Sequence, residues 1–275
     1  MSGNLLLASY PKSGNTWMRA FLSNLRQDTA EPADINDLDG VGAAGLMVFE
    51  EAVGVEASDL TDDEIDRCRP FVYRYLARNG SVPLYLKTHD SCRLLPEGQP
   101  LIPPETVSGV VYIMRNPLDV AVSFAHHMNR TIDHTIGKVM SVPYAFKTNI
   151  ADGLIWERLL SWSDHVLSWV NQTSIPMHIV RYEDMEREPV ETFTSVARFC
   201  GLPCDPGRIE RALRHSSFES LKAQEREKGF RERSYVAESF FRSGKSGAWR
   251  GVLSEAQIEQ IVHDHGIVMR RFGYL

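Results

Sequence analysis

The sequence predicts an α/β fold, a single domain in which a mainly parallel central sheet is flanked by helices. Short apolar runs bounded by turn residues alternate with longer stretches whose apolar residues recur at helical spacing. That alternation is typical of parallel strands joined by helical crossovers. The 275 residues contain no internal repeat and no low-complexity linker, so we expect one domain over residues 1–275.

Composition narrows the class of protein. Hydrophobic residues make up 43% of the chain and charged residues 24%, and the formal net charge is −6. These values are typical of a soluble globular protein and disfavour general nucleic-acid binding. No apolar run has the length of a membrane span, and the first residues lack the pattern of a signal peptide. The four cysteines form no CxxC pair, which favours reduced thiols in the cytoplasm and disfavours a zinc site.

The N-terminal stretch predicts a strand, a tight loop and a helix. Residues 5–8 form a short apolar run, residues 10–14 form a turn that contains Lys12, and helical periodicity begins at Asn15. The start of a helix presents unpaired backbone N–H groups and the positive end of the helix dipole, so this loop suits a phosphate or a sulfate. Many similar turns bind nothing, and the loop alone leaves both interpretations open. It is not a Walker A loop, because Lys12 precedes Gly14.

Two further strands are followed by polar residues that suit a binding site. The run 83–89 ends in Lys87 and His89, and the apolar strand 107–114 is followed by Arg115. Ligands of open α/β sheets bind beyond the carboxyl ends of the strands, so we expect these side chains at the same edge as the N-terminal loop. Taken alone, a capping role for His89 and a surface ion pair for Arg115 stay open.

The remaining elements follow from periodicity and from capping signals. Thr61 and Glu64 match a capping box, which opens a helix that reaches about Arg78. Residues 126–150 and 224–247 show no regular periodicity and are expected to be irregular, mobile segments. The other predicted elements are an amphipathic helix over 151–172, a strand over 176–182, and helices over 189–200, 206–223 and 254–272.

Five short motifs stand in order along the chain between residues 10 and 250. They are Tyr10-Pro11-Lys12-Ser13-Gly14-Asn15-Thr16-Trp17, Lys87-Thr88-His89, Arg115-Asn116-Pro117 with Asp119 and Ser123, Tyr182-Glu183-Asp184, and Arg242 with Gly244, Gly247 and Trp249. Together they resemble the motifs of cytosolic sulfotransferases, which use 3′-phosphoadenosine 5′-phosphosulfate (PAPS) as donor. Asn15 stands where the family has Thr, and Ser243 where it has Lys. Each motif is weak alone, but the ordered set is specific.

The resemblance implies a P-loop-like, phosphosulfate-binding strand–loop–helix and an in-line transfer of a sulfuryl group without a metal. PAPS would be the co-substrate, and adenosine 3′,5′-bisphosphate (PAP) would be the product. His89 is expected to act as general base, a role that the ordinary imidazole pKa of about 6.5 suits. Lys12 and Lys87 would stabilise the developing charge. The implied donor-binding residues are Lys12, Ser13, Gly14, Asn15, Thr16 and Trp17 in the loop, Arg115 and Ser123 at the 3′-phosphate, Tyr182, Ser216 and Phe218 around the adenine, and Arg242, Ser243 and Gly244 closing over the 3′-phosphate.

The acceptor and the partners follow less directly. The chain begins close to its first strand, and this compact form resembles bacterial members that sulfate secondary metabolites, glycopeptide antibiotics among them. We therefore expect a small-molecule or natural-product acceptor with a hydroxyl or an amine, no nucleic-acid partner and no membrane association. The family's dimerisation segment matches poorly between Arg250 and Glu259, so a homodimer would use another surface. Residues 40–50, 126–148 and 225–241 are expected to frame the acceptor pocket.

Two other functions compete with this interpretation. A nucleotide-dependent phosphotransferase requires a Walker A lysine after the glycine and an acidic Mg²⁺ ligand, and the sequence shows neither clearly. A non-catalytic nucleotide-binding protein has no need for a histidine beside two lysines, so His89, Lys12 and Lys87 disfavour it.

Overall fold

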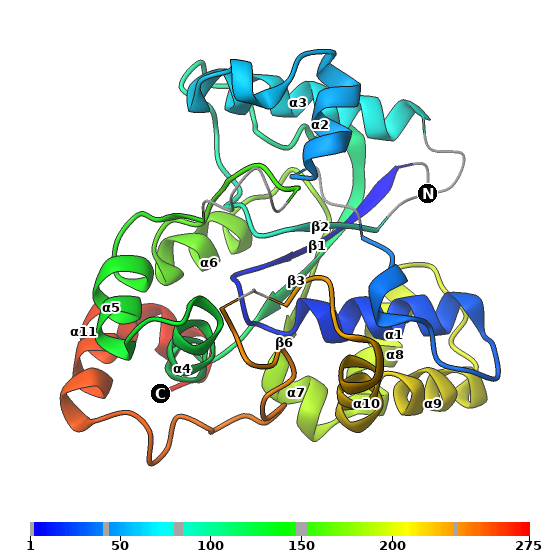
Figure 1. The fold of residues 1–275 in the computed structure, drawn as a ribbon, viewed down its shortest axis with the longest axis vertical. Coiled ribbons are helices and arrows are strands. Elements are labelled where there is room, and N and C mark those ends of the chain that lie inside the picture. Colours follow the sequence, from blue (N-terminus) through cyan, green and yellow to red (C-terminus); the bar gives the residue numbers. More distant parts are fainter. Residues whose placement is uncertain (1–2, 41–43, 80–84, 147–152, 234–235) are drawn as a thin grey trace. The chain divides into compact units, whose positions relative to one another are not determined.

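The computed structural model describes residues 3–40, 44–79, 85–146, 153–233 and 236–275. The predicted strand start at 83–84 lies outside the described residues, as do 41–43, 147–152 and 234–235 of the segments named above. Packing divides the chain into two compact units (Figure 1). The first unit contains Met1–Tyr10, Gly40–Tyr112 and Pro143–His178, and the second contains Pro11–Asp39, Ile113–Val142 and Ile179–Leu275.

A four-stranded sheet with the order β2-β1-β3-β6 confirms the predicted α/β class with a parallel sheet. Strands β1 and β2 run parallel, with Leu5 opposite Tyr85 and Ala8 opposite Thr88. All residues of β1 are buried, as expected of a strand covered on both faces. The strands are β1 (Asn4–Ser9), β2 (Tyr85–Thr88), β3 (Val107–Met114) and β6 (Met177–Arg181).

Within its described residues the first unit also contains three α-helices, two 3-10 turns, η2 (Ala57–Asp59) and η3 (Pro104–Thr106), and a short strand pair. The α-helices and the paired strands are α2 (Leu46–Val53), α3 (Asp62–Asn79), α6 (Trp162–Val170), and the antiparallel strands β4 (Ala145–Phe146) and β5 (Glu157–Arg158). Helix α2 packs against α3. The predicted capping box opens α3, because the Thr61 N–H donates to the Glu64 carboxylate at 2.8 Å and the Thr61 hydroxyl accepts from the Glu64 N–H at 3.4 Å.

The second unit is mainly helical. Its helices are α1 (Asn15–Gln27), α4 (Pro117–Met128), α5 (Ile132–Thr135), a π-helical turn η4 (Ile136–Met140), α7 (Tyr182–Arg187), α8 (Pro189–Phe199), α9 (Pro206–His215), α10 (Phe218–Lys228) and α11 (Glu255–Arg271). Helix α1 packs against α9, and α11 packs against α4. Asn116 caps α4, because its side chain accepts from the Leu118 N–H.

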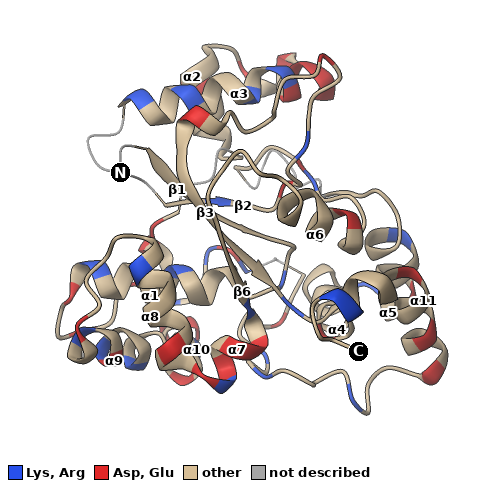
Figure 2. Cartoon of the chain, turned by 180° about the vertical axis from the view of Figure 1, so that it is seen from behind, with Lys and Arg blue, Asp and Glu red and all other residues tan. Residues whose placement is uncertain are grey.

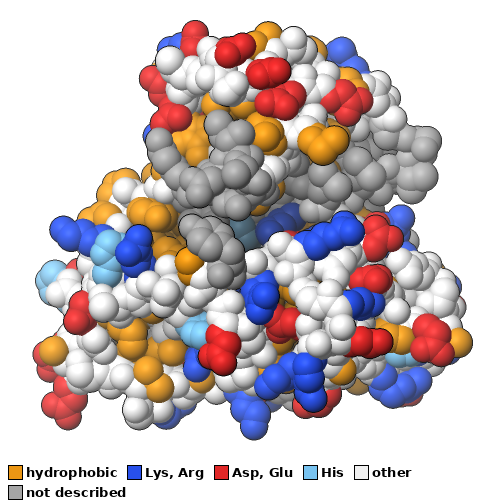
Figure 3. Space-filling model, viewed as in Figure 1, with side chains coloured by type: hydrophobic (Ala, Val, Ile, Leu, Met, Phe, Trp, Pro, Cys, Tyr) orange, Lys and Arg blue, Asp and Glu red, His pale blue; other side chains and the backbone are white. Residues whose placement is uncertain are grey.

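Charges of both signs are mixed on the surface. Helices α9 and α10 each carry both basic and acidic residues (Figure 2), and the face drawn in Figure 3 also shows charges of both signs. No helix in the described parts of the chain is long and apolar enough to cross a bilayer.

The predicted helix over 151–172 is wrong for its first half. Among the described residues, β5 and an extended stretch precede α6, which begins only at Trp162. Leu160 has a positive φ of 62°, a conformation that ends regular structure. Ser161 then caps α6 by accepting from the Asp164 N–H. The tryptophan spacing was consistent with one long helix, but the turn at Leu160 divides it.

Three other predicted boundaries also differ from the structure. Residues 126–150 were expected to be irregular, yet the described part contains the end of α4, α5 and η4. The helix predicted over 206–223 is two helices, because Ser217 accepts from the Ser220 N–H and starts α10. Helix α10 continues to Lys228, inside the segment 224–247 that was expected to be irregular. Local capping by serine overrides periodicity at this point.

Candidate active site

The loop between β1 and α1 has the backbone geometry of an anion-binding turn. Gly14 caps α1 with a φ of 104°, and Lys12 has a φ of 67°. Ser13 is 0% exposed, and its hydroxyl has no hydrogen-bond partner among the described residues. A buried hydroxyl without a partner costs free energy, which a ligand oxygen at the start of the helix would offset. The loop therefore has the features of an anion site, and its predicted contact with the phosphosulfate of PAPS stays a prediction.

Tyr182 at the start of α7 closes one side of this loop. A Cβ atom added at Gly14 would lie 2.7 Å from Cδ2 of the Tyr182 ring, so only glycine fits there. The Tyr182 ring also has an edge contact with Trp17, with centroids 5.7 Å apart. The guanidinium of Arg115 lies 4.0 Å from the centroid of the Tyr182 ring, which is favourable for a cation and an aromatic face. Three of the predicted motifs thus meet in the second unit.

Arg115 joins the loop to the C-terminal segment. Its guanidinium donates to the Lys12 carbonyl at 3.1 Å and to the Lys245 carbonyl at 3.0 Å. Its Nε is buried and has no hydrogen-bond partner among the described residues. An arginine held in this way presents a fixed planar cation, which suits bidentate contact with a phosphate.

The C-terminal segment depends on two acidic residues that the sequence analysis assigned no role in the site. Asp119 accepts from the backbone N–H groups of Gly247 at 2.7 Å and Trp249 at 3.1 Å. Glu186 accepts from the Ser246 N–H at 2.7 Å. Asp119 lies inside the Arg115 motif, so its position in that motif was the available signal.

Gly244 lies against the ring of Phe218. A Cβ atom at Gly244 would lie 2.2 Å from Cδ2 of that ring, and its φ is 63°, so both space and backbone conformation require glycine. Two neighbours in the same motif are more accessible, since Arg242 is exposed and Ser243 is half-buried. The structure therefore brings Gly244 and Phe218 together.

Trp17 and Phe218, the predicted adenine neighbours, pack against one apolar cluster in the second unit. Its buried members are Ala20, Ile35, Leu38, Leu221, Phe230 and Phe241. Ser216 is buried, and its hydroxyl donates to the Ala212 carbonyl at 2.8 Å. The Ser216 proton is thus used inside α9, and only its acceptor capacity remains. Ser123 is half-buried in the second turn of α4.

Lys12 and the predicted base belong to different units. The Lys12 ammonium lies 3.9 Å from the centroid of the Phe240 ring, within the second unit. Lys87 and His89 belong to the first unit, where Lys87 is half-buried in β2 opposite Leu7. In the part of the chain that the structure describes, no three His, Cys, Asp or Glu side chains gather as metal ligands would.

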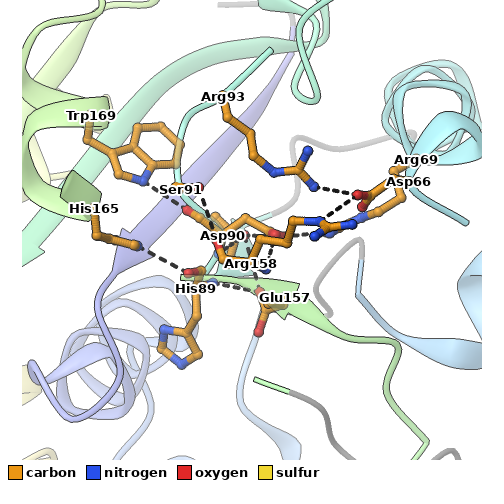
Figure 4. A network of polar contacts seen from close by, with 11 residues as sticks. Asp66, Arg69, His89, Asp90, Ser91, Arg93, Glu157, Arg158, His165 and Trp169 are labelled. Carbon is orange, nitrogen blue, oxygen red and sulfur yellow. Dashed lines mark hydrogen bonds and ion pairs between the residues drawn. The ribbon is translucent and has the colours of Figure 1, made fainter. Parts of the chain in front are cut away.

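His89 lies in the turn after β2, where both its backbone and its ring have partners; Figure 4 shows the backbone contacts with Glu157 and His165. The His89 N–H donates to the Glu157 carboxylate at 2.6 Å, and its carbonyl lies 3.1 Å from Nε2 of His165. Nδ1 of His89 lies 2.7 Å from the Ser9 carbonyl oxygen. Because a carbonyl only accepts, Nδ1 carries the proton of the neutral ring, and Nε2 keeps its lone pair.

A buried ion pair lies next to this turn. Asp90 and Arg69 are both 0% exposed, and their carboxylate and guanidinium are 2.5 Å apart. Asp90 also accepts from the Arg158 N–H at 2.8 Å, and its carbonyl accepts from the Trp169 indole at 2.9 Å. Burial raises the pKa of Asp90, while Arg69 and the Arg158 N–H oppose that rise. The sequence analysis missed Glu157 and His165, because it placed both in one amphipathic helix.

Comparison with known proteins supports the motif assignment. The family model for the sulfotransferase domain matches residues 2–273. The flavonol 3-sulfotransferase of Flaveria bidentis is 27% identical over 94% of this chain and 79% of the plant enzyme. The luciferin sulfotransferase of Photinus pyralis is 27% identical over 93% of this chain and 68% of the firefly enzyme.

Two solved structures have a similar fold. Mouse sulfotransferase SULT7A1 complexed with PAP gives a TM-score of 0.61 at 18% identity, over 98% of this chain and 85% of that one. Retinol dehydratase in complex with androsterone and inactive cofactor PAP gives a TM-score of 0.64 at 20% identity, over 97% of this chain and 80% of that one. At these identities the likeness shows the fold, whereas the family model covers nearly the whole sequence. The chain therefore belongs to the sulfotransferase domain family, and the predicted PAPS-dependent sulfotransferase is confirmed.

Proposed function

We propose that the chain transfers a sulfuryl group from PAPS to a hydroxyl or an amine of a small-molecule acceptor, with His89 as general base. The observation that carries the proposal is the meeting of the loop 11–17, Arg115, Tyr182 and the Gly244 segment in one unit. PAPS carries a 5′-phosphosulfate and a separate 3′-phosphate, so it requires two anion sites. The helix start at Ser13 and the cation at Arg115 supply two.

The donor-binding roles follow the predicted assignment. The backbone at Ser13, Asn15 and Thr16 faces the phosphosulfate, because the N–H groups at the start of α1 have no helical partner. Arg115 and Ser123 hold the 3′-phosphate. The aromatic rings of Trp17 and Phe218 hold the adenine, with Tyr182 and Ser216 at its edge. Arg242, Ser243 and Gly244 complete the 3′-phosphate site.

Three residues of this chain have a role in the proposed chemical step. Bound PAPS supplies an activated sulfuryl group, and PAP is the leaving group when that sulfuryl group is transferred. His89 accepts the acceptor's proton at Nε2, since the Ser9 carbonyl holds the ring's proton on Nδ1. Lys12 and Lys87 offset negative charge that develops during transfer, which is usually the largest single contribution to catalysis.

The acceptor is proposed at the level of a class. Two relatives are named for a flavonol and for luciferin, so these compounds open an acceptor screen, and a glycopeptide antibiotic tests the proposed bacterial natural-product specificity. The segments 40–50, 126–148 and 225–241 are proposed to line the acceptor pocket. Chimeras in these segments would alter the ranking of acceptors if the proposal holds.

The test is an assay with PAPS and each acceptor at neutral pH, followed by chromatography for PAP and mass spectrometry for the sulfated product. We expect equal amounts of PAP and product, and tight binding of PAP by calorimetry without Mg²⁺. Arg115→Ala should lose PAP binding. Binding of ATP with Mg²⁺ in preference to PAP would overturn the proposal in favour of a phosphotransferase. Binding of PAP without turnover of any acceptor would favour a non-catalytic protein.

A further inference from the structure

The backbone of His89 is held from both sides by two side chains of the segment 157–165. Glu157 accepts from the His89 N–H at 2.6 Å, and His165 faces the His89 carbonyl at 3.1 Å. Glu157 is 8% exposed and His165 is 0% exposed, so water does not compete freely for either contact. In Figure 4 the His89 ring points away from both partners. These two contacts therefore fix the peptide groups and leave the ring to its own partner.

His165 has only one way to make its contact. Its Nε2 faces a carbonyl and must donate, so Nδ1 has no proton and accepts from the Tyr112 hydroxyl at 2.9 Å. The Tyr112 ring stacks on the His165 ring with centroids 5.8 Å apart. Burial lowers the pKa of His165 to about 3, which keeps the ring neutral at neutral pH. His165 is thus a fixed donor.

Glu157 joins the same turn to the buried ion pair. Its carboxylate also accepts from the Thr88 hydroxyl at 3.3 Å, and Thr88 bonds to Asp90. Asp90 is paired with Arg69 at 2.5 Å. Thr88, on one side of His89, therefore bonds both to Glu157 and to Asp90 on the other side, so a shift of Glu157 would disturb the turn beyond His89 itself.

The orientation of the His89 ring depends on that backbone. Nδ1 of His89 reaches the Ser9 carbonyl at 2.7 Å and the Ser9 hydroxyl at 3.3 Å. We propose that Glu157 and His165 are positioning residues that hold His89 in the Nδ1–H tautomer and so present Nε2 as the base. This inference rests on the proposed function, which gives His89 the role of base.

The test combines a spectroscopic signature with kinetics in the full-length protein. With ¹⁵N-labelled histidine, long-range ¹H–¹⁵N spectra report the tautomer of His89, assigned by the signals that His89→Ala removes. We expect the Nδ1–H form in the wild type and loss of that form in Glu157→Leu. Glu157→Gln keeps an accepting oxygen and should restore it. At His165 the corresponding variants are His165→Leu, which should lose the Nδ1–H form, and His165→Gln, which keeps an N–H donor and should restore it.

The kinetic result should separate positioning from folding. In Glu157→Leu, kcat should fall roughly 10- to 100-fold, part of what a general base contributes, while the KM for PAPS and the Kd for PAP stay within about twofold. Glu97→Gln, at an exposed ion pair in the same unit, is the matched control and should change neither kcat nor the binding of the donor. Unchanged tautomer and kcat in folded Glu157→Leu would overturn the proposal, leaving Glu157 a structural role.

The proposed function and this inference fail in different ways. If His89→Ala turned over normally while Glu157→Leu altered the tautomer, His89 would not be the base, yet the positioning contacts would stand. If wild-type His89 were in the Nε2–H form, the positioning proposal would be wrong, and sulfuryl transfer would still be measured independently by formation of PAP.

Discussion

The loop after β1 and the turn after β2 both follow the carboxyl end of a strand in one sheet, yet they are built in different ways. The first uses backbone groups, with Gly14 starting α1 and a buried Ser13 hydroxyl. The second carries His89, whose orientation depends on side chains about 70 residues later, Glu157 and His165. The backbone geometry of the first loop depends on residues that are adjacent in the sequence. The orientation of the His89 ring depends on contacts with residues far away in the sequence. The two regions should therefore respond differently to mutation.

The largest expected effect is on turnover, at the second region. His89→Ala should lower kcat by roughly 10²- to 10⁴-fold, the usual contribution of a general base. Calorimetry should give a PAP affinity within about twofold of the wild type, because the residues proposed for the nucleotide end of the donor, among them Arg115, Tyr182 and Phe218, belong to the other unit. Near-normal turnover would refute the base assignment, and a parallel loss of PAP affinity would remove the distinction between the two regions.

The next effect is on stability and tests the buried charges beside His89. Arg69→Met leaves Asp90 buried without its cation and should lower the free energy of unfolding by about 3–5 kcal/mol in urea titrations. Arg67→Met is the matched control, since Arg67 pairs with Glu97 at an exposed site and should cost about 1 kcal/mol or less. Equal effects of the two changes would contradict a special role for the buried pair.

A smaller effect is expected at the donor side. Gly244→Ala forces a methyl group into the Phe218 ring and should weaken PAP binding by roughly 10-fold, or about 1.4 kcal/mol, by calorimetry. Gly251→Ala is matched, because Gly251 has a φ of +77° but no atom within 4 Å of the added Cβ. It carries the same backbone strain without the clash, so it should leave PAP binding unchanged. Equal losses in both variants would point to backbone strain alone.

The smallest effect is a pH dependence of stability. The folded pKa of His165 is about 3, below the ordinary value, so under about pH 6.5 the unfolded state binds a proton that the folded state does not. This contribution to stability is present above pH 6.5 and is lost as pH falls. Between pH 7 and 5.5 the wild type should lose about 1 kcal/mol more than His165→Gln. If the free energies of unfolding of the wild type and of His165→Gln, measured in urea, changed with pH in parallel, His165 would not be held neutral.

The sequence predicted the parallel sheet and the motif residues at its strand ends, because these depend on local patterns. The capping box of Thr61 and Glu64 predicted the start of α3 from neighbouring residues alone. The roles of Glu157 and His165 could not be predicted. The apolar spacing predicted one helix over both residues, whereas the backbone at Leu160 has a positive φ and the helix begins only after it. Asp119 was visible within its motif, but the N–H groups that donate to its carboxylate, those of Gly247 and Trp249, lie about 130 residues away.

Arg115 has a consequence for the thermodynamics of donor binding. Its guanidinium is already anchored to the carbonyls of Lys12 and Lys245 and covers the Tyr182 ring. A long side chain normally loses rotamer freedom when it grips a ligand. Here that freedom is lost during folding, so the entropy of binding should reflect mainly ordering of the nucleotide and release of water. Arg115, which we propose as the ligand of the 3′-phosphate, is thus already held in place before the donor binds.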